Sequence, residues 1–183
     1  MKITSVLRTR AALLAASAVL VGSLGSAAPA TAVTPASVAD RLDMARAYAG
    51  TARYNYEAFA IADGYIGAGD DECVEVPGLG AMGIHYVNPQ RFGPLDPNRP
   101  STLLYIPGPG GRRQLVGVEY YQIDADGDLA TDGDRPSLFG QAFDGPMPGH
   151  FPGQPVHYDL HVWLWRYNPS GMFAPFNPSL SCG

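Results

Sequence analysis

Glycine and proline divide the chain after residue 64 into short segments, and this division limits the fold more than any other feature. The segments are rich in β-branched and aromatic residues, which is typical of strands. The strand candidates are Cys73–Val76, Gly83–Val87, Thr102–Ile106, Leu115–Ile123 and Val156–Tyr167. Gly108–Gly111 predicts a hairpin turn, and Asp144–Pro148 predicts another turn. The 22 glycines and 17 prolines approach the composition of disorder, but 10 tyrosines and 7 phenylalanines favour an ordered, loop-rich β fold.

One amphipathic helix is predicted before these strands. Ser37 and Asp40 have the spacing of a capping box, with Asp in the place of Glu or Gln. Apolar residues then recur at steps of three and four, as on one face of a helix: Val38, Leu42, Ala45, Ala49, Ala52, Tyr56 and Phe59. Asp63-Gly64 is expected to end the helix. We therefore predict an α+β fold, with this helix packed on a curved, mainly antiparallel sheet that forms a half-barrel.

Residues 1–32 have the pattern of a secretory signal peptide. Lys2, Arg8 and Arg10 precede a short apolar run at 11–24, and Ala30-Thr31-Ala32 matches a cleavage site. The run is too short for a membrane span, and no later segment is long and apolar enough for one. We therefore expect a secreted protein with a single globular domain over residues 33–183. In such a protein Cys73 and Cys182 predict one disulfide, since no Cys-x-x-Cys spacing favours a metal pair or a reactive thiol.

Charge and missing motifs exclude several function classes. The chain has 17 Asp and Glu against 12 Lys and Arg, and its only lysine, Lys2, falls in the predicted signal peptide. This argues against nucleic acid or an anionic membrane as a partner, and against a lysine nucleophile. Gly78–Gly83 matches G-x-G-x-x-G, but a strand follows it where dinucleotide binding needs a helix. Nucleophile-elbow, zinc-protease and P-loop signatures are absent, and the oligomeric state is left open.

The segment His157–Arg166 carries the most chemistry. As a strand it places His157, Asp159 and His161 on one face, opposite an aliphatic face. With His85 and Glu119 these residues form a candidate metal or ligand site, because imidazoles and carboxylates from neighbouring antiparallel strands can converge on a divalent transition metal such as Zn, Mn or Fe. The aromatic residues predicted to line the pocket are Tyr120, Tyr121, Trp163 and Trp165.

Three functional interpretations fit this cluster. The first is a secreted protein that binds a small molecule or a metal ion. The second is a metal-dependent, cupin-like enzyme at the same site, with Glu119 or Asp159 as base, although the compact H-x-H…E spacing of cupins is absent. The third is a structural extracellular protein, in which the histidines and Glu119 form only a buried hydrogen-bond cluster.

An acidic segment lies between two strand candidates and contains Asp124, Asp126, Asp128, Asp132 and Asp134. Its start resembles a calcium loop, with acids at positions 1, 3, 5 and 9. Leu129 stands where that loop needs glycine, Arg135 stands where it needs a bidentate Glu, and no helices flank it. A calcium site and a solvated hairpin tip both remain open.

Through several short sequence segments, the chain resembles a group of secreted bacterial proteins with no assigned activity. The segments are Ala62–Tyr65, Cys73-Val74, Gly80–Asn88, Leu115–Tyr120, Leu160–Trp163 and Asn168–Phe173 followed by Asn177-Pro178 and Cys182. They span nearly all of residues 33–183. The resemblance implies no particular fold, substrate or cofactor, and the acidic segment departs from the shared pattern.

Overall fold

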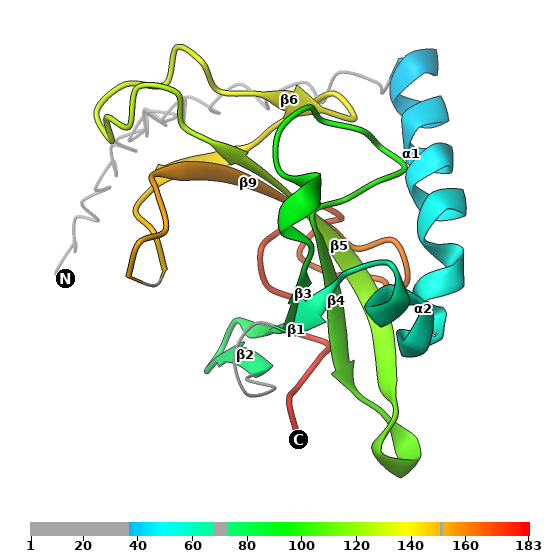
Figure 1. Ribbon diagram of the computed structural model, residues 1–183. Helices are drawn as coiled ribbons and strands as arrows, with labels where there is room; N and C mark the ends of the chain where they lie inside the picture. Colours follow the sequence, from blue (N-terminus) through cyan, green and yellow to red (C-terminus); the bar gives the residue numbers. More distant parts are fainter. Residues whose placement is uncertain (1–36, 68–72, 151) are drawn as a thin grey trace, which may run out of the picture. The chain divides into compact units, whose positions relative to one another are not determined.

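A seven-stranded antiparallel sheet dominates the computed structural model, which describes residues 37–67, 73–150 and 152–183 (Figure 1). The strand order is β1-β3-β4-β5-β9-β8, and β2 also pairs with β3. The strands are β1 (Ile66–Gly67), β2 (Cys73–Val76), β3 (Gly80–Val87), β4 (Thr102–Pro107), β5 (Arg113–Ile123), β8 (Asp144–Met147) and β9 (His157–Val162). With the N-terminal helix this confirms the α+β prediction, whereas the half-barrel curvature stays a prediction. The predicted signal peptide lies outside the described residues.

The predicted hairpin turn is confirmed. It joins β4 to β5 through Pro109–Gly111, where Gly110 and Gly111 have φ values of 71° and 74°. Such positive φ angles suit glycine, because it has no Cβ to clash with the backbone. A second small hairpin, which the sequence did not indicate, pairs β6 (Ser137–Leu138) with β7 (Gln141–Ala142).

The predicted strands are present with boundaries that differ by up to five residues, and two differences matter most. β9 ends at Val162 rather than Tyr167, because the next two backbone N–H groups do not bond β5: Trp163 donates to Met172 and Leu164 to Val162. Only Trp165 bonds β5 again, at Val116. The segment predicted as a turn at Asp144–Pro148 is instead β8, which pairs with β9 across an irregular step. Gly145-Pro146 occupies that step, where a proline without an N–H is tolerated in a strand.

The two faces of the sheet have different partners. One face is covered by the helices and by Phe139 and Phe143, and its core is rich in tyrosine. The buried hydroxyls find acceptors, as in the bonds from Tyr105 to the Tyr54 carbonyl (2.7 Å) and from Tyr120 to the Pro97 carbonyl (2.7 Å). On the other face a smaller cluster packs beneath the C-terminal segment: Ala81, Leu104, Ile106, Val116, Trp163 and Leu180. The candidate metal residues lie on this second face.

The N-terminal helix begins as predicted but buries a different face. The capping box of Ser37 and Asp40 is present, and the helix runs as α1 (Val38–Thr51), a 3-10 turn η1 (Ala52–Asn55) and α2 (Glu57–Ala62), which Asp63 caps. The predicted apolar face is wrong, because Val38, Leu42, Tyr56 and Phe59 are exposed. The buried residues are Ala47, Thr51, Tyr54 and Ala60. Tyrosines of the sheet fill most of the space between the sheet and the helix, so small side chains on the helix allow it to approach the sheet closely. No described helix has the length and apolarity that crossing a membrane requires.

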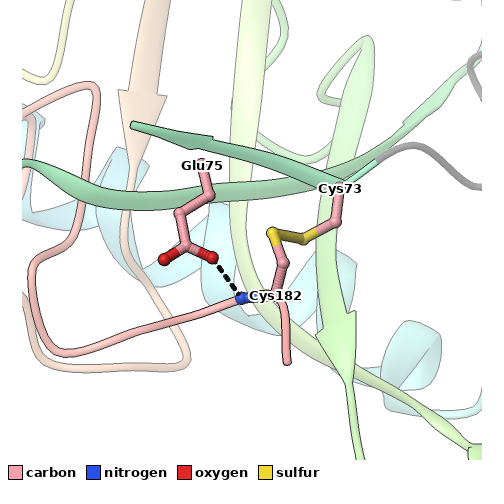
Figure 2. The surroundings of a disulfide bond; sticks show 3 residues. All are labelled: Cys73, Glu75 and Cys182. Carbon is pink, nitrogen blue, oxygen red and sulfur yellow. Dashed lines mark hydrogen bonds between the residues drawn. A yellow bond between two sulfur atoms is a disulfide. The ribbon is translucent and has the colours of Figure 1, made fainter. Parts of the chain in front are cut away.

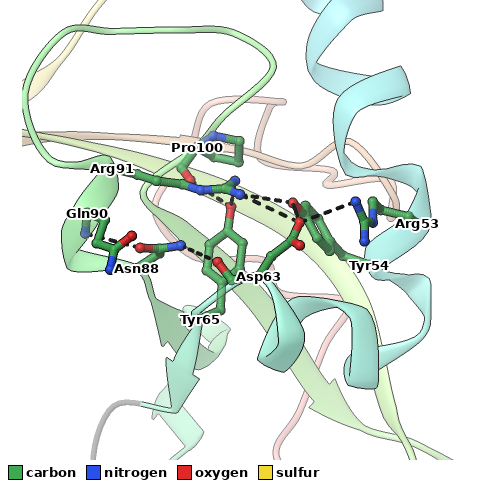
Figure 3. Close-up of polar contacts among 8 residues, drawn as sticks. All are labelled: Arg53, Tyr54, Asp63, Tyr65, Asn88, Gln90, Arg91 and Pro100. Carbon is green, nitrogen blue, oxygen red and sulfur yellow. Dashed lines mark hydrogen bonds and ion pairs between the residues drawn. The ribbon is translucent and has the colours of Figure 1, made fainter.

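Arg91 connects the ends of these helices to the loop before β4 (Figure 3). Its guanidinium donates to the hydroxyls of Tyr65 and Tyr54 and lies 3.8 Å from Asp63. Tyr54 also donates to Asp63 (2.7 Å), and Tyr65 donates to the carbonyl of Pro100 (2.8 Å). The helical segment is therefore fixed to the sheet by a network of charge-assisted hydrogen bonds as well as by apolar contact.

The disulfide predicted between Cys73 and Cys182 is present (Figure 2). It joins β2 to the C-terminal segment across a sequence separation of 109 residues. Beside it, the Glu75 carboxylate accepts a hydrogen bond from the backbone N–H of Cys182 at 2.7 Å. An isolated bridge between Ala81 and Asn177 adds a second attachment of the same segment to β3.

A pair of substitutions on α1 distinguishes the observed helix orientation from the predicted one. Ala47→Leu should destabilise the protein by about 1–3 kcal/mol, because it overfills a completely buried position. Ala49→Leu, on the exposed face, should change stability by less than about 0.5 kcal/mol. Urea unfolding of both variants measures this, and the opposite ranking would favour the face predicted from the sequence.

Removing the disulfide should also lower stability. On the chain-entropy model, closing so long a loop contributes about 4–5 kcal/mol, so Cys73→Ser/Cys182→Ser should lose a free energy of unfolding of that order. Reducing the wild-type protein should reproduce the loss. Coincident unfolding curves for oxidised wild type and the double variant would contradict this expectation.

Candidate metal centre

Three different strands supply the residues of the cluster formed by His85, Glu119 and His161. His85 lies on β3, Glu119 on β5 and His161 on β9. Glu119 and His161 are direct cross-strand partners, so their side chains leave the sheet side by side. β4 lies between β3 and β5, so the backbones of β3 and β5 are about 10 Å apart. The side chains of His85 and Glu119 extend towards each other across this distance.

Residues around the cluster fit this approach. Gly117 lies opposite Leu104 on β4, which in turn pairs with His85. A Cβ at Gly117 would lie 2.9 Å from the Val162 carbonyl oxygen and 3.4 Å from the side chains of Leu104 and Trp163, so glycine lets these residues pack closely beside the cluster. Ser101 fixes the backbone at Glu119, since its hydroxyl donates to the Glu119 carbonyl (3.2 Å) and accepts from the Tyr121 N–H (2.9 Å). The sequence did not indicate Ser101, because this role depends on the strand register and not on a motif.

The distances within the cluster are compatible with three side chains that share one metal ion. Nε2 of His85 lies 3.5 Å and Nε2 of His161 lies 4.0 Å from the same oxygen, Oε2 of Glu119. One ligand atom from each residue falls within 4.8 Å of the other two. Two ligands on a tetrahedral ion with bonds near 2.1 Å are separated by about 3.4 Å. The three side chains therefore need to move little to share one ion.

His161 carries the clearest sign of a missing partner. Both of its ring nitrogens are buried and neither makes a hydrogen bond among the described residues. A buried polar group without a partner costs about 1–3 kcal/mol. Nδ1 lies 3.6 Å from Oδ1 of Asp159, and this carboxylate is placed to orient the ring, as carboxylates behind metal-bound histidines do.

Electrostatics separates the two histidines. Burial, helped by the neighbouring His161, lowers the pKa of His85 to about 4, so this ring is neutral at pH 7 as a ligand must be. Burial by itself would lower the pKa of His161, but Asp159 and Glu119 outweigh it and raise that pKa. Burial raises the pKa of Glu119, although His161 opposes the shift. Burial therefore disfavours the charged form of Glu119, and a cation bound beside it would oppose this shift and favour the carboxylate.

Two of the five predicted site residues lie outside the three-ligand cluster. Asp159 is adjacent to it through His161, as described above. His157 is on the same face of β9 but four residues away, and its ring bonds the Pro155 carbonyl (3.0 Å) and stacks on Tyr121. Strand geometry explains the separation, since four residues along a strand span about 13 Å.

The four predicted pocket aromatics do not surround the cluster. Tyr120 lies in the core beneath the helices, and Trp165 packs against that core and stacks on Tyr48 at 4.1 Å. Tyr121 stacks on His157, and Trp163 donates to the Ala174 carbonyl. Trp163 does line a cavity of about 240 Å³, but its other walls come from the 167–172 turn.

The acidic segment is a separate location, immediately after β5, and its residues do not belong to the histidine cluster.

Comparison with known proteins identified no related protein. No family model matches the chain, and searches of curated proteins and of solved structures found no match. The resemblance to secreted bacterial proteins therefore stays a prediction.

Proposed function

We propose that this protein is a secreted metal-binding protein that holds one divalent transition metal ion through His85, Glu119 and His161. The observation that carries the proposal is the buried, unpartnered Nε2 of His161, which faces a carboxylate shared with a second histidine. An ion bound at this point would satisfy all three side chains at once. A donor set of two imidazoles and one carboxylate suits zinc and iron.

The exposed fractions indicate how an ion would enter. The side chain of His85 is 18% exposed and that of Glu119 is 11% exposed, whereas His161 is 2% exposed. His161 therefore forms the floor of the centre and His85 its rim. A free coordination position would face the side of His85.

The number of ligands favours a second candidate function, a metal-dependent enzyme. Among the described residues the cluster offers three protein ligands. Closed structural zinc sites use four, whereas catalytic sites use three and leave a position for water or substrate. The binding function remains the primary proposal, because the described residues around the cluster do not indicate a substrate.

Two observations support export. The signal-like pattern at residues 1–32 is that of a secretory leader. The disulfide between Cys73 and Cys182 is of the kind that persists in oxidising compartments outside the cytosol.

Metal analysis tests the proposal directly. The full chain, purified without chelator and then exposed to equimolar zinc and dialysed, should retain about one metal ion per chain by mass spectrometry. Glu119→Gln keeps the size of the side chain but removes its charge, and it should lose the ion while remaining folded by circular dichroism.

His157→Asn is the matched control, because it removes a histidine from the same face of β9 that lies outside the cluster. It should retain the ion. Failure of the wild type to hold metal, or equal retention by Glu119→Gln, would refute the proposal.

Asp159 should act on affinity through His161. Asp159→Asn removes the negative charge behind Nδ1, so the dissociation constant for zinc should rise about 10–100-fold while one ion still binds at saturation. Competition with a chromogenic chelator measures the constant. Asp43→Asn, which removes an acid from α1 that pairs with Arg46 and not with the cluster, serves as the control and should leave it nearly unchanged. Equal affinities of wild type and Asp159→Asn would show that the carboxylate does not orient the ring.

A further inference from the structure

The loop after β5 contains a buried carboxylate oxygen without a partner. Asp124 is only 4% exposed, and its Oδ2 is buried with no hydrogen bond among the described residues. The other oxygen of the same group, Oδ1, accepts N–H bonds from Asp126 (3.1 Å) and Gly127 (2.9 Å). The carboxylate therefore points into the loop, and one of its oxygens lacks the donor or cation that burial demands.

A second acid lies against the Asp124 carboxylate. The side chain of Asp126 contacts that of Asp124. Asp126 also accepts from the Asp128 N–H (2.9 Å) and the Thr131 hydroxyl (2.8 Å). Arg135, which follows the loop, bonds neither of these two acids but donates to the Phe143 carbonyl (2.8 Å) and pairs with Asp132 (3.2 Å). Two carboxylates thus meet without a cation between them.

We propose that the loop from Asp124 to Asp134 binds a calcium ion, with Asp124 and Asp126 as its anchoring ligands. This site is separate from the histidine cluster. Its donors are oxygens, which calcium prefers, and a calcium ion completes its shell of 6–8 ligands with further carboxylates, carbonyls and water. The ion would occupy the side of Asp124 that now lacks a partner.

Asp134 supplies the closure that the sequence pattern lacked. Arg135 stands at the position of the bidentate Glu of a calcium loop, but the preceding Asp134 folds back so that its Oδ2 accepts from the Ala125 N–H at 2.7 Å. Its Oδ1 accepts from the Tyr158 hydroxyl of β9 at 2.8 Å. The loop is therefore already closed and attached to the sheet before an ion binds.

The affinity should be that of an extracellular calcium module. Among the described residues, no three carboxylates of the loop lie within 4.8 Å of one another, so binding has to draw further oxygens towards Asp124. This reorganisation favours a dissociation constant of about 10⁻⁴–10⁻³ M, which extracellular calcium satisfies.

Thermal unfolding of the full chain after chelator treatment tests the proposal. About 5 mM calcium should raise the Tm by about 3–6 °C, the shift that a roughly tenfold excess over the dissociation constant gives a domain of this size. Asp124→Asn keeps the Oδ1 acceptor and places an amide donor beside Asp126. This variant should be at least as stable as wild type without calcium, and should lose the calcium shift.

Two controls separate this site from other effects. Asp43→Asn removes an acid from α1, and Glu119→Gln disables the histidine cluster; both should keep the full calcium shift. The proposal is overturned if wild type shows no shift, if Asp124→Asn keeps it, if Glu119→Gln abolishes it, or if magnesium at the same concentration shifts the Tm equally. None of these outcomes depends on whether the histidine cluster binds zinc.

Discussion

The cross-strand pair of Glu119 and His161 is the interaction on which the candidate site depends, and the aliphatic side of the same strands fixes it. Side chains alternate along a strand, so packing Val118 and Tyr120 of β5, together with Leu160 of β9, beneath the helices forces the residues between them onto the opposite face. A slip of one residue in either strand would bury aliphatic side chains in the wrong layer. Burying a carboxylate and an imidazole is unfavourable, because both lose their hydration. Packing of the hydrophobic core compensates for this cost and holds the two groups side by side.

Sequence reasoning predicted much of this arrangement because the strand period carries it. Alternation in residues 157–162, and the position of Glu119 as a single carboxylate within an apolar strand, are sufficient to predict that Glu119 and His161 lie on one face. His85 followed from the same logic one hairpin earlier. The two-residue period does not determine which residues are cross-strand partners, since register depends on turns and bulges. For that reason the sequence pattern groups His157 with His161, although four residues of strand separate them, and it does not indicate the role of Ser101.

The helix and the aromatics show where pattern fails. Both helix faces carry apolar residues, and the pattern predicts burial of the face with the larger ones, Val38 and Leu42, which are exposed in the structure. The sheet already supplies bulky tyrosines, so the face with Ala47 and Thr51 packs better against it. Extending the strand beyond Val162 predicts that Trp163 and Trp165 both share the face of the histidines. Trp163 does lie on that face, in the smaller cluster, whereas Trp165 packs against the opposite core, because the regular strand ends at Val162.

Geometry favours the proposed metal centre over a buried hydrogen-bond cluster. A proton on Nε2 of His161 would face Oε2 of Glu119 across 4.0 Å, which is beyond hydrogen-bond range. The same oxygen lies 3.5 Å from His85, so one proton would leave at least one buried atom of the cluster without a partner. A divalent ion acts differently, since it attracts all three atoms at once and its bonds of about 2.1 Å fit between them. The spacing that is too wide for a proton is thus suitable for a metal, and this holds for the binding protein and for the enzyme alike.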